Sequence, residues 1–180
     1  MLSLLKKYKG RLYDIGCGNG RDVIFFNKKN ILCTGIDKSK EAIKKNKKKF
    51  NLFQDSFVKK NFCDLLNKKK KENISIYSRF TLHAINYKEE KILLNSFKNA
   101  KNMEYLFIEC RTLKDELYGI GKKIGKHEFV TSHYRRFIDP KILKNKLKKN
   151  FKILYFKQSK NFAKFKNENP CVLRLIAKKK

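Results

Sequence analysis

The sequence predicts an α/β fold in which a central, mostly parallel seven-stranded sheet carries helices on both faces and ends in an antiparallel hairpin. Three observations predict this class. Strand-length apolar runs alternate with helical stretches over the first 110 residues, the pattern of a parallel sheet. A glycine-rich turn, residues 16–20, joins the first run to a helix, and two apolar runs close the chain. From the length of 180 residues we expect one domain spanning 1–180.

Strands are expected where apolar and β-branched residues form short runs between turn residues. Five of these runs precede residue 111. Each is followed by a polar or helical stretch, which favours parallel pairing. The last two are joined only by the polar stretch 157–170, which favours a hairpin. The expected strands are residues 11–15, 32–36, 56–62, 73–77, 104–110, 151–156 and 171–177.

Four helices are expected from apolar residues at helical spacing and from capping residues. Ser39 can cap the second helix, and Asp139 followed by Pro140 is a helix start signal. The first ten residues are interpreted as a short lead-in, and the lysine tail 178–180 as a frayed end. The expected helices are residues 20–28, 38–49, 88–99 and 140–149.

The segment 111–138 breaks the alternation of strands and helices. It is rich in glycine, histidine, tyrosine and arginine, and no clear period runs through it. A loop this long in a compact domain is usually functional or disordered. We expect an irregular loop on the substrate side of the fold.

The glycine turn and the residue before it indicate what kind of ligand binds there. A dinucleotide fingerprint would need its third glycine at position 21, where this chain has arginine, and no phosphate-binding Gly-Lys-Ser/Thr follows. Asp14, two residues before Gly16, places a carboxylate beside the ligand, which repels a pyrophosphate and suits an ammonium group. The turn therefore predicts a nucleoside that carries positive charge.

The pattern Asp14-Ile15-Gly16-Cys17-Gly18-Asn19-Gly20 resembles the first motif of class I S-adenosylmethionine-dependent methyltransferases. The resemblance implies a Rossmann-like methyltransferase fold with S-adenosyl-L-methionine as cofactor. It also implies a ribose-binding acid after the second strand, matched by Asp37, and an adenine-binding acid after the third, matched by Asp64 in Phe62-Cys63-Asp64. The alternative is that Asp14 and Asp37 only cap turns in another α/β domain. The predicted cofactor-binding residues are Asp14, Gly16, Cys17, Gly18, Asn19, Asp37, Asp64 and Ser78.

The formal net charge of +30 attracts polyanions, but lysine spread along the whole chain is also what a compositional bias produces. Arginine is more informative because only seven are present and guanidinium alone binds an oxyanion with two parallel hydrogen bonds. Several arginines follow predicted strands, where ligand sites of α/β folds lie. The predicted substrate-binding residues are Arg79, Arg111, Tyr134, Arg135 and Arg136, although any single one could be a structural ion pair.

Methyl transfer depends mainly on alignment, but an alcohol acceptor must also lose its proton. His83, which follows the fourth strand, is the first candidate base and His133 the second. Each could instead be a hydrogen-bonded structural histidine. The segments 78–80, 109–111 and 133–137 are similar to those of small bacterial methyltransferases associated with cell-surface glycan synthesis. This implies O-methylation of a small or glycan-linked anionic acceptor.

Two other functions were weighed. A nucleic-acid (RNA) methyltransferase would use the positive charge, but the fourth strand lacks the Pro-Pro motif of base-methylating enzymes. A non-catalytic partner subunit is disfavoured by the full motif set.

Five cysteines without metal-ligand spacing predict reduced thiols and no metal site. No apolar run is long enough for a membrane helix. We therefore expect a cytoplasmic protein, whose oligomeric state the sequence does not define.

Overall fold

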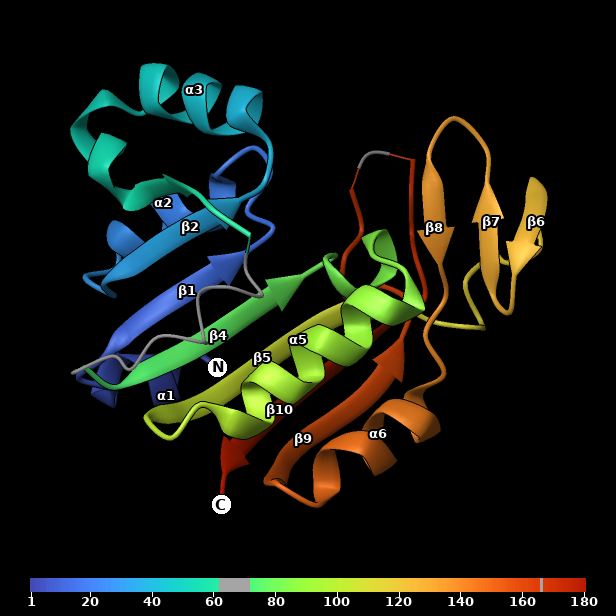
Figure 1. The fold of residues 1–180 in the computed structure, drawn as a ribbon. Coiled ribbons are helices and arrows are strands. Elements are labelled where there is room, and N and C mark those ends of the chain that lie inside the picture. Colours follow the sequence, from blue (N-terminus) through green and yellow to red (C-terminus); the bar gives the residue numbers. More distant parts are fainter. Residues whose placement is uncertain (62–71, 166) are drawn as a thin grey trace.

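The computed structural model describes residues 1–61, 72–165 and 167–180. In this part of the chain a seven-stranded sheet has the order β3-β2-β1-β4-β5-β10-β9 (Figure 1). The first five strands are parallel, and β10 pairs antiparallel with β5 and β9. The predicted fold class is confirmed. The strands are β1 (Arg11–Ile15), β2 (Cys33–Asp37), β3 (Phe57–Lys59), β4 (Ile74–Arg79), β5 (Met103–Arg111), β9 (Phe151–Ser159) and β10 (Val172–Lys179).

Helices cover both faces of this sheet, because each strand alternates its apolar side chains between two cores. On one face, α5 (Tyr87–Asn99) and α6 (Pro140–Lys148) bury apolar residues of β1, β4, β5 and β10. On the other, α1 (Leu2–Lys7), α2 (Arg21–Asn27) and α3 (Lys40–Lys49) pack in the second core. Two 3₁₀ turns, η1 (Asn51–Ser56) and η2 (Leu82–Ala84), complete the described helical elements.

The first ten residues are not a plain lead-in. They contain α1, and Leu5 is almost completely buried in the second core. A helix of six residues is too short to show a helical period, so this burial had no sequence signal.

Several strand boundaries also differ from the predictions by one to three residues; β9, for example, runs to Ser159, three residues beyond the predicted end. The fourth strand runs two residues beyond the predicted end at Tyr77, because Ser78 and Arg79 still pair with β5. The third strand is the short β3, and the end predicted at Phe62 lies outside the described residues.

The segment 111–138 is not irregular. It forms a small antiparallel sheet of β6 (Lys122–Gly125), β7 (Glu128–Val130) and β8 (Tyr134–Arg136). The β6–β7 turn places His127 at a φ of 62°, a conformation that sequence patterns rarely announce for histidine. In Figure 1 the small sheet projects beyond the carboxyl edge of the main sheet, the edge at which the parallel strands end.

The lysine tail is ordered, contrary to the prediction of a frayed end. Lys178 and Lys179 pair with β9. The Lys179 ammonium donates to the last carbonyls of α5, including that of Phe97 at 3.0 Å, and the Lys180 ammonium donates to the Lys148 carbonyl at 2.8 Å. Positive groups are favourable at the carboxyl end of a helix, so the tail caps α5 and α6.

A buried ion pair joins the small sheet to α5. Glu90 accepts hydrogen bonds from the Arg136 guanidinium and, at 2.6 Å, from the Lys146 ammonium. Arg136 also donates to the carbonyls of Ile85 and Leu82, at 2.9 and 3.0 Å. Both partners of the Glu90–Arg136 pair are shielded from water, so each depends on the other.

We expect Glu90→Ala to lower the free energy of unfolding by about 3–5 kcal/mol, because it leaves Arg136 charged, buried and unpaired. Urea denaturation measures the change. The control is Glu104→Ala, which removes a looser pair with Lys178 at 3.8 Å and should cost less than about 1 kcal/mol. Equal losses in the two variants would contradict a structural role for the Glu90–Arg136 pair.

Candidate functional site

The glycine turn lies at the carboxyl end of β1 and is held against β2. The backbone N–H groups of Gly16 and Cys17 both donate to the Ile36 carbonyl, at 2.7 and 3.1 Å. Gly16 and Gly18 have positive φ angles of 71° and 50°, which favour glycine. A Cβ atom at Gly18 would meet nothing within 4 Å, so this part of the turn faces open space.

Thr81, which the sequence analysis did not single out, locks the other side of the turn. Its hydroxyl donates to the Ile15 carbonyl at 2.5 Å. A Cβ atom at Gly16 would lie 2.9 and 3.0 Å from Thr81 side-chain atoms, so only glycine fits beneath that threonine. The contact fixes the end of β1 against the residues that follow β4.

Asp37 stands at the end of β2 and faces the turn. One carboxylate oxygen accepts from the Gly18 N–H at 3.0 Å, and the other from the Ser39 N–H at 2.9 Å. Asn19 is exposed, and its side-chain oxygen accepts from the Arg21 N–H at 3.4 Å. Asp64, the predicted adenine-binding acid, lies outside the described residues.

Asp14 is a buried carboxyl group, only 2% exposed. Burial raises the pKa of Asp14 well above its usual value, and the negative charges of Asp22 and Asp37 raise it further, while Arg79 acts in the opposite direction. Three carboxylates therefore converge beside the glycine turn. Such a site favours a ligand with positive charge.

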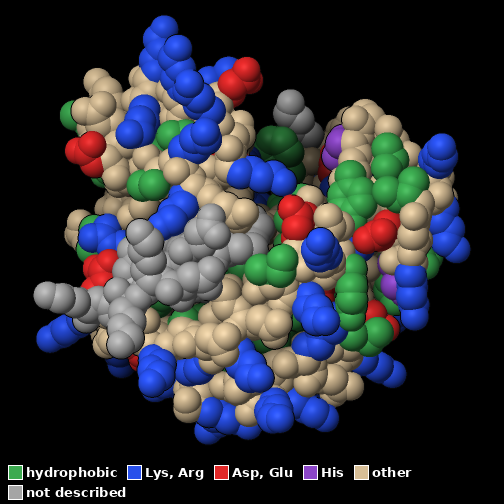
Figure 2. Space-filling view, viewed as in Figure 1, with side chains coloured by type: hydrophobic (Ala, Val, Ile, Leu, Met, Phe, Trp, Pro, Cys, Tyr) green, Lys and Arg blue, Asp and Glu red, His purple; other side chains and the backbone are tan. Residues whose placement is uncertain are grey.

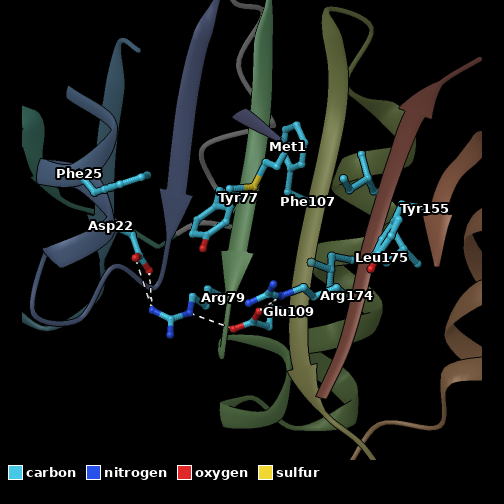
Figure 3. Close-up of a pocket in the computed structure, with 12 residues that line it drawn as sticks. Met1, Asp22, Phe25, Tyr77, Arg79, Phe107, Glu109, Tyr155, Arg174 and Leu175 are labelled. Atoms are coloured by element: carbon cyan, nitrogen blue, oxygen red, sulfur yellow. Dashed lines mark hydrogen bonds and ion pairs between the residues drawn. The ribbon is translucent and has the colours of Figure 1, made fainter. Parts of the chain in front are cut away.

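A row of alternating charges crosses the carboxyl edge next to this turn (Figure 3). Arg79 on β4 donates to Asp22 of α2 at 3.1 Å and to Glu109 of β5 at 3.0 Å. Glu109 also accepts from Arg174 on β10. Because Arg79, Glu109 and Arg174 are direct cross-strand neighbours, their side chains share one face of the sheet.

A cavity of about 510 Å³ lies on this face of the sheet, and the charged row forms its end toward the carboxyl edge (Figure 3). Its walls are mostly apolar and include Met1, Phe25, Phe107 and Tyr155. The lining contains neither the glycine turn nor Asp37, so this cavity is separate from the surface that those residues form.

Ser78 and Cys17, two other predicted cofactor residues, are buried. Ser78 alternates with Arg79 along β4 and therefore lies on the opposite face of the sheet from the charged row. Among the described residues its hydroxyl has no hydrogen-bond partner. Burial raises the pKa of the Cys17 thiol, so that group stays protonated and inert.

Beyond the ends of β4 and β5, positive groups surround His83. Burial, and then the positive charges of Arg111, Arg135, Arg136 and His133, lower the pKa of His83 to about 3. The Nδ1 atom of His83 lies 3.5 Å from the Arg111 backbone N–H. The structure thus brings both predicted histidines and three of the predicted arginines into one electropositive region.

The predicted substrate residues in this region differ in how they are bound. Arg136 is held by Glu90, and the Tyr134 hydroxyl donates to Glu128 at 2.9 Å. Arg135 donates to the Thr131 hydroxyl at 2.9 Å, and none of the carboxylates that the structure describes forms an ion pair with it. Burial, and then the charge of Arg111, lower the pKa of Arg135.

Phe80, directly after β4, has a φ of 61°, a strained conformation for an aromatic residue. Its ring packs 5.1 Å from that of His83, and the guanidinium carbons of Arg79 and Arg111 lie 5.1 and 6.0 Å from its centre. Backbone strain leaves no sequence pattern, so the sequence marks Phe80 only as part of the segment 78–80.

The remaining positive charge is mainly lysine. Figure 2 shows Lys and Arg side chains over most of the visible face, with a concentration on α3. Within the described residues, no helix is long and apolar enough to cross a membrane. The same residues contain no cluster of His, Cys, Asp or Glu arranged to hold a metal ion.

Solved structures share this fold. A SAM-dependent methyltransferase from Methanosarcina mazei is 19% identical, with 99% of this chain and 96% of that chain covered and a TM-score of 0.81. A SAM-dependent methyltransferase from Archaeoglobus fulgidus is 19% identical, with 99% and 90% covered and a TM-score of 0.68. The glycopeptide N-methyltransferase MtfA, complexed with S-adenosyl-L-homocysteine, is 12% identical, with 99% and 86% covered and a TM-score of 0.69. At these identities the likeness shows the fold.

A protein-family comparison extends this from fold to family. No curated protein sequence matches the chain. The methyltransferase domain family, however, matches residues 6–168, which include the glycine turn, Asp37 and the region around His83. The chain therefore belongs to the methyltransferase domain family and is an S-adenosyl-L-methionine-dependent methyltransferase.

Proposed function

We propose that the glycine turn and Asp37 hold S-adenosyl-L-methionine, with Asp14 as a buried carboxyl group beside the turn. The residues fit this cofactor. Gly18 faces open space, so a ligand can approach the backbone, and Asp37 offers two carboxylate oxygens to a ribose. Asp14, Asp22 and Asp37 together favour the positive charge that the cofactor carries. Gly16, Cys17, Asn19 and Asp64 stay predicted cofactor residues, and Asp64 lies outside the described part.

We further propose that the acceptor is a small or glycan-linked anion, methylated on oxygen in front of β4 and β5. The observation that carries this proposal is the set of cations around His83, among which Arg135 forms no ion pair with a described carboxylate. The Arg111 guanidinium repels that of Arg135, and an anion bound between them would offset this repulsion. Such a region binds oxyanions and lowers the pKa of an acceptor hydroxyl.

His83 is a poor general base in this setting. A group with a pKa of about 3 is neutral at pH 7 but holds a proton too weakly to remove one from an ordinary alcohol. An oxygen that reaches the site ionised needs no base. The cofactor supplies an activated methyl group, and the chain supplies alignment: Thr81 and Phe80 fix the wall between the two sites, and the cations orient the acceptor.

The geometry also changes the roles proposed for Arg79, Arg136 and Tyr134. Arg79 is engaged by Asp22 and Glu109, and Arg136 by Glu90, so neither guanidinium is open to a substrate. The Tyr134 hydroxyl is engaged by Glu128. We assign these three residues to the support of the site, and keep Arg111, Arg135 and His133 as the residues that face the acceptor.

The other predictions stay open. An RNA acceptor is favoured only by the lysines of α3 and of the wider surface, which form a diffuse field and lack the arginine forks of specific readout. Cys17, Cys33, Cys110 and Cys171 are free and buried, in keeping with the predicted cytoplasmic location. A glycan-linked acceptor is supported by the sequence resemblance.

The first test concerns the cofactor. Asp37→Asn should weaken S-adenosyl-L-homocysteine binding about ten- to a hundredfold, because an amide is a weaker acceptor for ribose hydroxyls and offers one oxygen. Isothermal titration calorimetry measures the affinity. The control Glu104→Gln changes an acid near the opposite edge of the sheet and should bind as the wild type does. An unchanged affinity in Asp37→Asn would remove Asp37 from the cofactor site.

The second test concerns the acceptor. With methyl-tritiated S-adenosyl-L-methionine, label should reach small uronic acids or sugar phosphates, and mild alkali should release it from a carboxyl ester and not from an ether. Arg135→Gln should raise the acceptor KM about tenfold or more, since a charged hydrogen bond is lost. The exposed Lys122→Gln on β6 is the matched control. Labelling of RNA in place of small anions would contradict the proposal.

The third test concerns His83. Without a role as base, His83→Gln should keep kcat within about threefold, whereas removal of a true base costs about a hundredfold or more.

The same variant tests the low pKa of His83. Since folding lowers the pKa of His83 from 6.5 to about 3, the unfolded chain binds this proton at a higher pH than the folded chain does, and the free energy of unfolding falls as pH drops below about 6.5. Urea denaturation at pH 7 and 5 should show a smaller loss in His83→Gln. The exposed His133→Gln is the control. If the free energy of unfolding of His83→Gln depends on pH as that of the wild type does, the low pKa of His83 is refuted.

A further inference from the structure

Arg111 has one fixed and one exchangeable carboxylate partner. Its Nη1 donates to both oxygens of Asp115, at 3.1 and 3.2 Å, and the Asp115 side chain is completely buried. Asp115 also accepts from the Leu117 N–H at 3.1 Å. One edge of the guanidinium is therefore permanently occupied, and its plane is held in place.

The other edge is bound differently. Nη2 of Arg111 donates to Glu168, whose side chain is 63% exposed and lies on the connection between β9 and β10, 57 residues away in sequence. Water competes for the exposed Glu168 carboxylate, although the Arg111 side chain itself is buried. Glu168 is therefore easier to displace from Arg111 than the completely buried Asp115.

The β9–β10 connection contacts residues beside the glycine turn and at the end of β5. Its base is closed by two hydrogen bonds between Asn161 and Asn169, at 2.7 and 2.8 Å. Phe165 packs 5.1 Å from the Arg21 guanidinium beside the glycine turn, while Glu168 reaches Arg111 at the end of β5. Since β4 lies between β1 and β5, this connection spans the carboxyl end of β4 (Figure 1).

We propose that Glu168 occupies the subsite of the acceptor's anionic group, and that a carboxylate or phosphate of the acceptor replaces it on Nη2 of Arg111. The inference rests on the proposed function, because it assigns this edge to the acceptor. Arg135 adds a second positive group: the charge of Arg111 lowers its pKa, and that of Glu168 raises it. The subsite thus selects acceptors with a two-oxygen anion and excludes neutral molecules of the same shape, which cannot displace Glu168.

The test uses Phe165→Trp as a reporter, because the chain has no tryptophan and this position lies beside Arg21. Inorganic phosphate and D-glucuronate are titrated separately at constant ionic strength maintained with chloride. Release of the connection should change the fluorescence in a saturable way. A response to only one probe identifies the class of anion, phosphate or carboxylate, that the subsite prefers.

The decisive variant is Glu168→Gln in the reporter background. Removal of an internal competitor should tighten binding of the preferred probe about two- to fivefold, the range expected for a weak ion pair whose carboxylate is exposed. The control is Glu116→Gln, which removes an exposed partner of Lys160 near the base of the same connection and should leave probe affinity unchanged. This control separates competition for Arg111 from simple loosening of the connection.

Thermal shifts of the unlabelled wild type and Glu168→Gln with the same probes give a second readout that does not depend on the reporter. An affinity that stays equal or falls in Glu168→Gln would overturn the proposal. So would equal responses to phosphate, glucuronate and chloride. Binding of S-adenosyl-L-homocysteine, measured in parallel, should be the same in all variants, and its absence would instead refute the proposed function.

Discussion

The alternating row Asp22, Arg79, Glu109 and Arg174 holds the carboxyl edge of the sheet together. It joins the first turn of α2 to three neighbouring strands, so the positions of the glycine turn and of the end of β5 are set by one set of contacts. Glu109 is shielded from water and serves two arginines, which makes it costly to lose. The positive charge of Arg79 also offsets part of the repulsion around Asp14.

Two regions of opposite charge lie at this edge of the sheet. Asp14, Asp22 and Asp37 gather beside the glycine turn, although the chain has only 16 acidic residues against 46 basic ones. Beyond the ends of β4 and β5, positive groups surround a neutral His83. In the function we propose, the first region would hold the cationic donor and the second an anionic acceptor. Charge that disappears in the reaction needs no later stabilisation, so alignment is the main task left to the protein.

The sequence predicted the features that depend on local chemistry. The glycine turn, β1, β2 and the start of α6 all follow from short-range rules for strands, turns and caps. It missed what depends on distant partners: Thr81 under Gly16, the three short strands within 111–138, and a lysine tail ordered by the carbonyl ends of α5 and α6. Short strands have too few residues to show alternation, and exposed lysine usually indicates a solvated end.

The arginines show why the same limit applies to the site. Their scarcity suggested that several would bind the substrate, but scarcity does not distinguish a structural guanidinium from a functional one. The burial of the carboxylate that binds each guanidinium makes this distinction. Glu90 and Glu109 are enclosed, so Arg136 and Arg79 belong to the fold, whereas Arg111 shares its second edge with the exposed Glu168. An arginine whose plane is fixed by one buried carboxylate, and whose other edge meets an exchangeable one, is rigid before the ligand arrives. That rigidity lowers the entropy cost of binding an anion and is the physical reason to place the acceptor at Arg111.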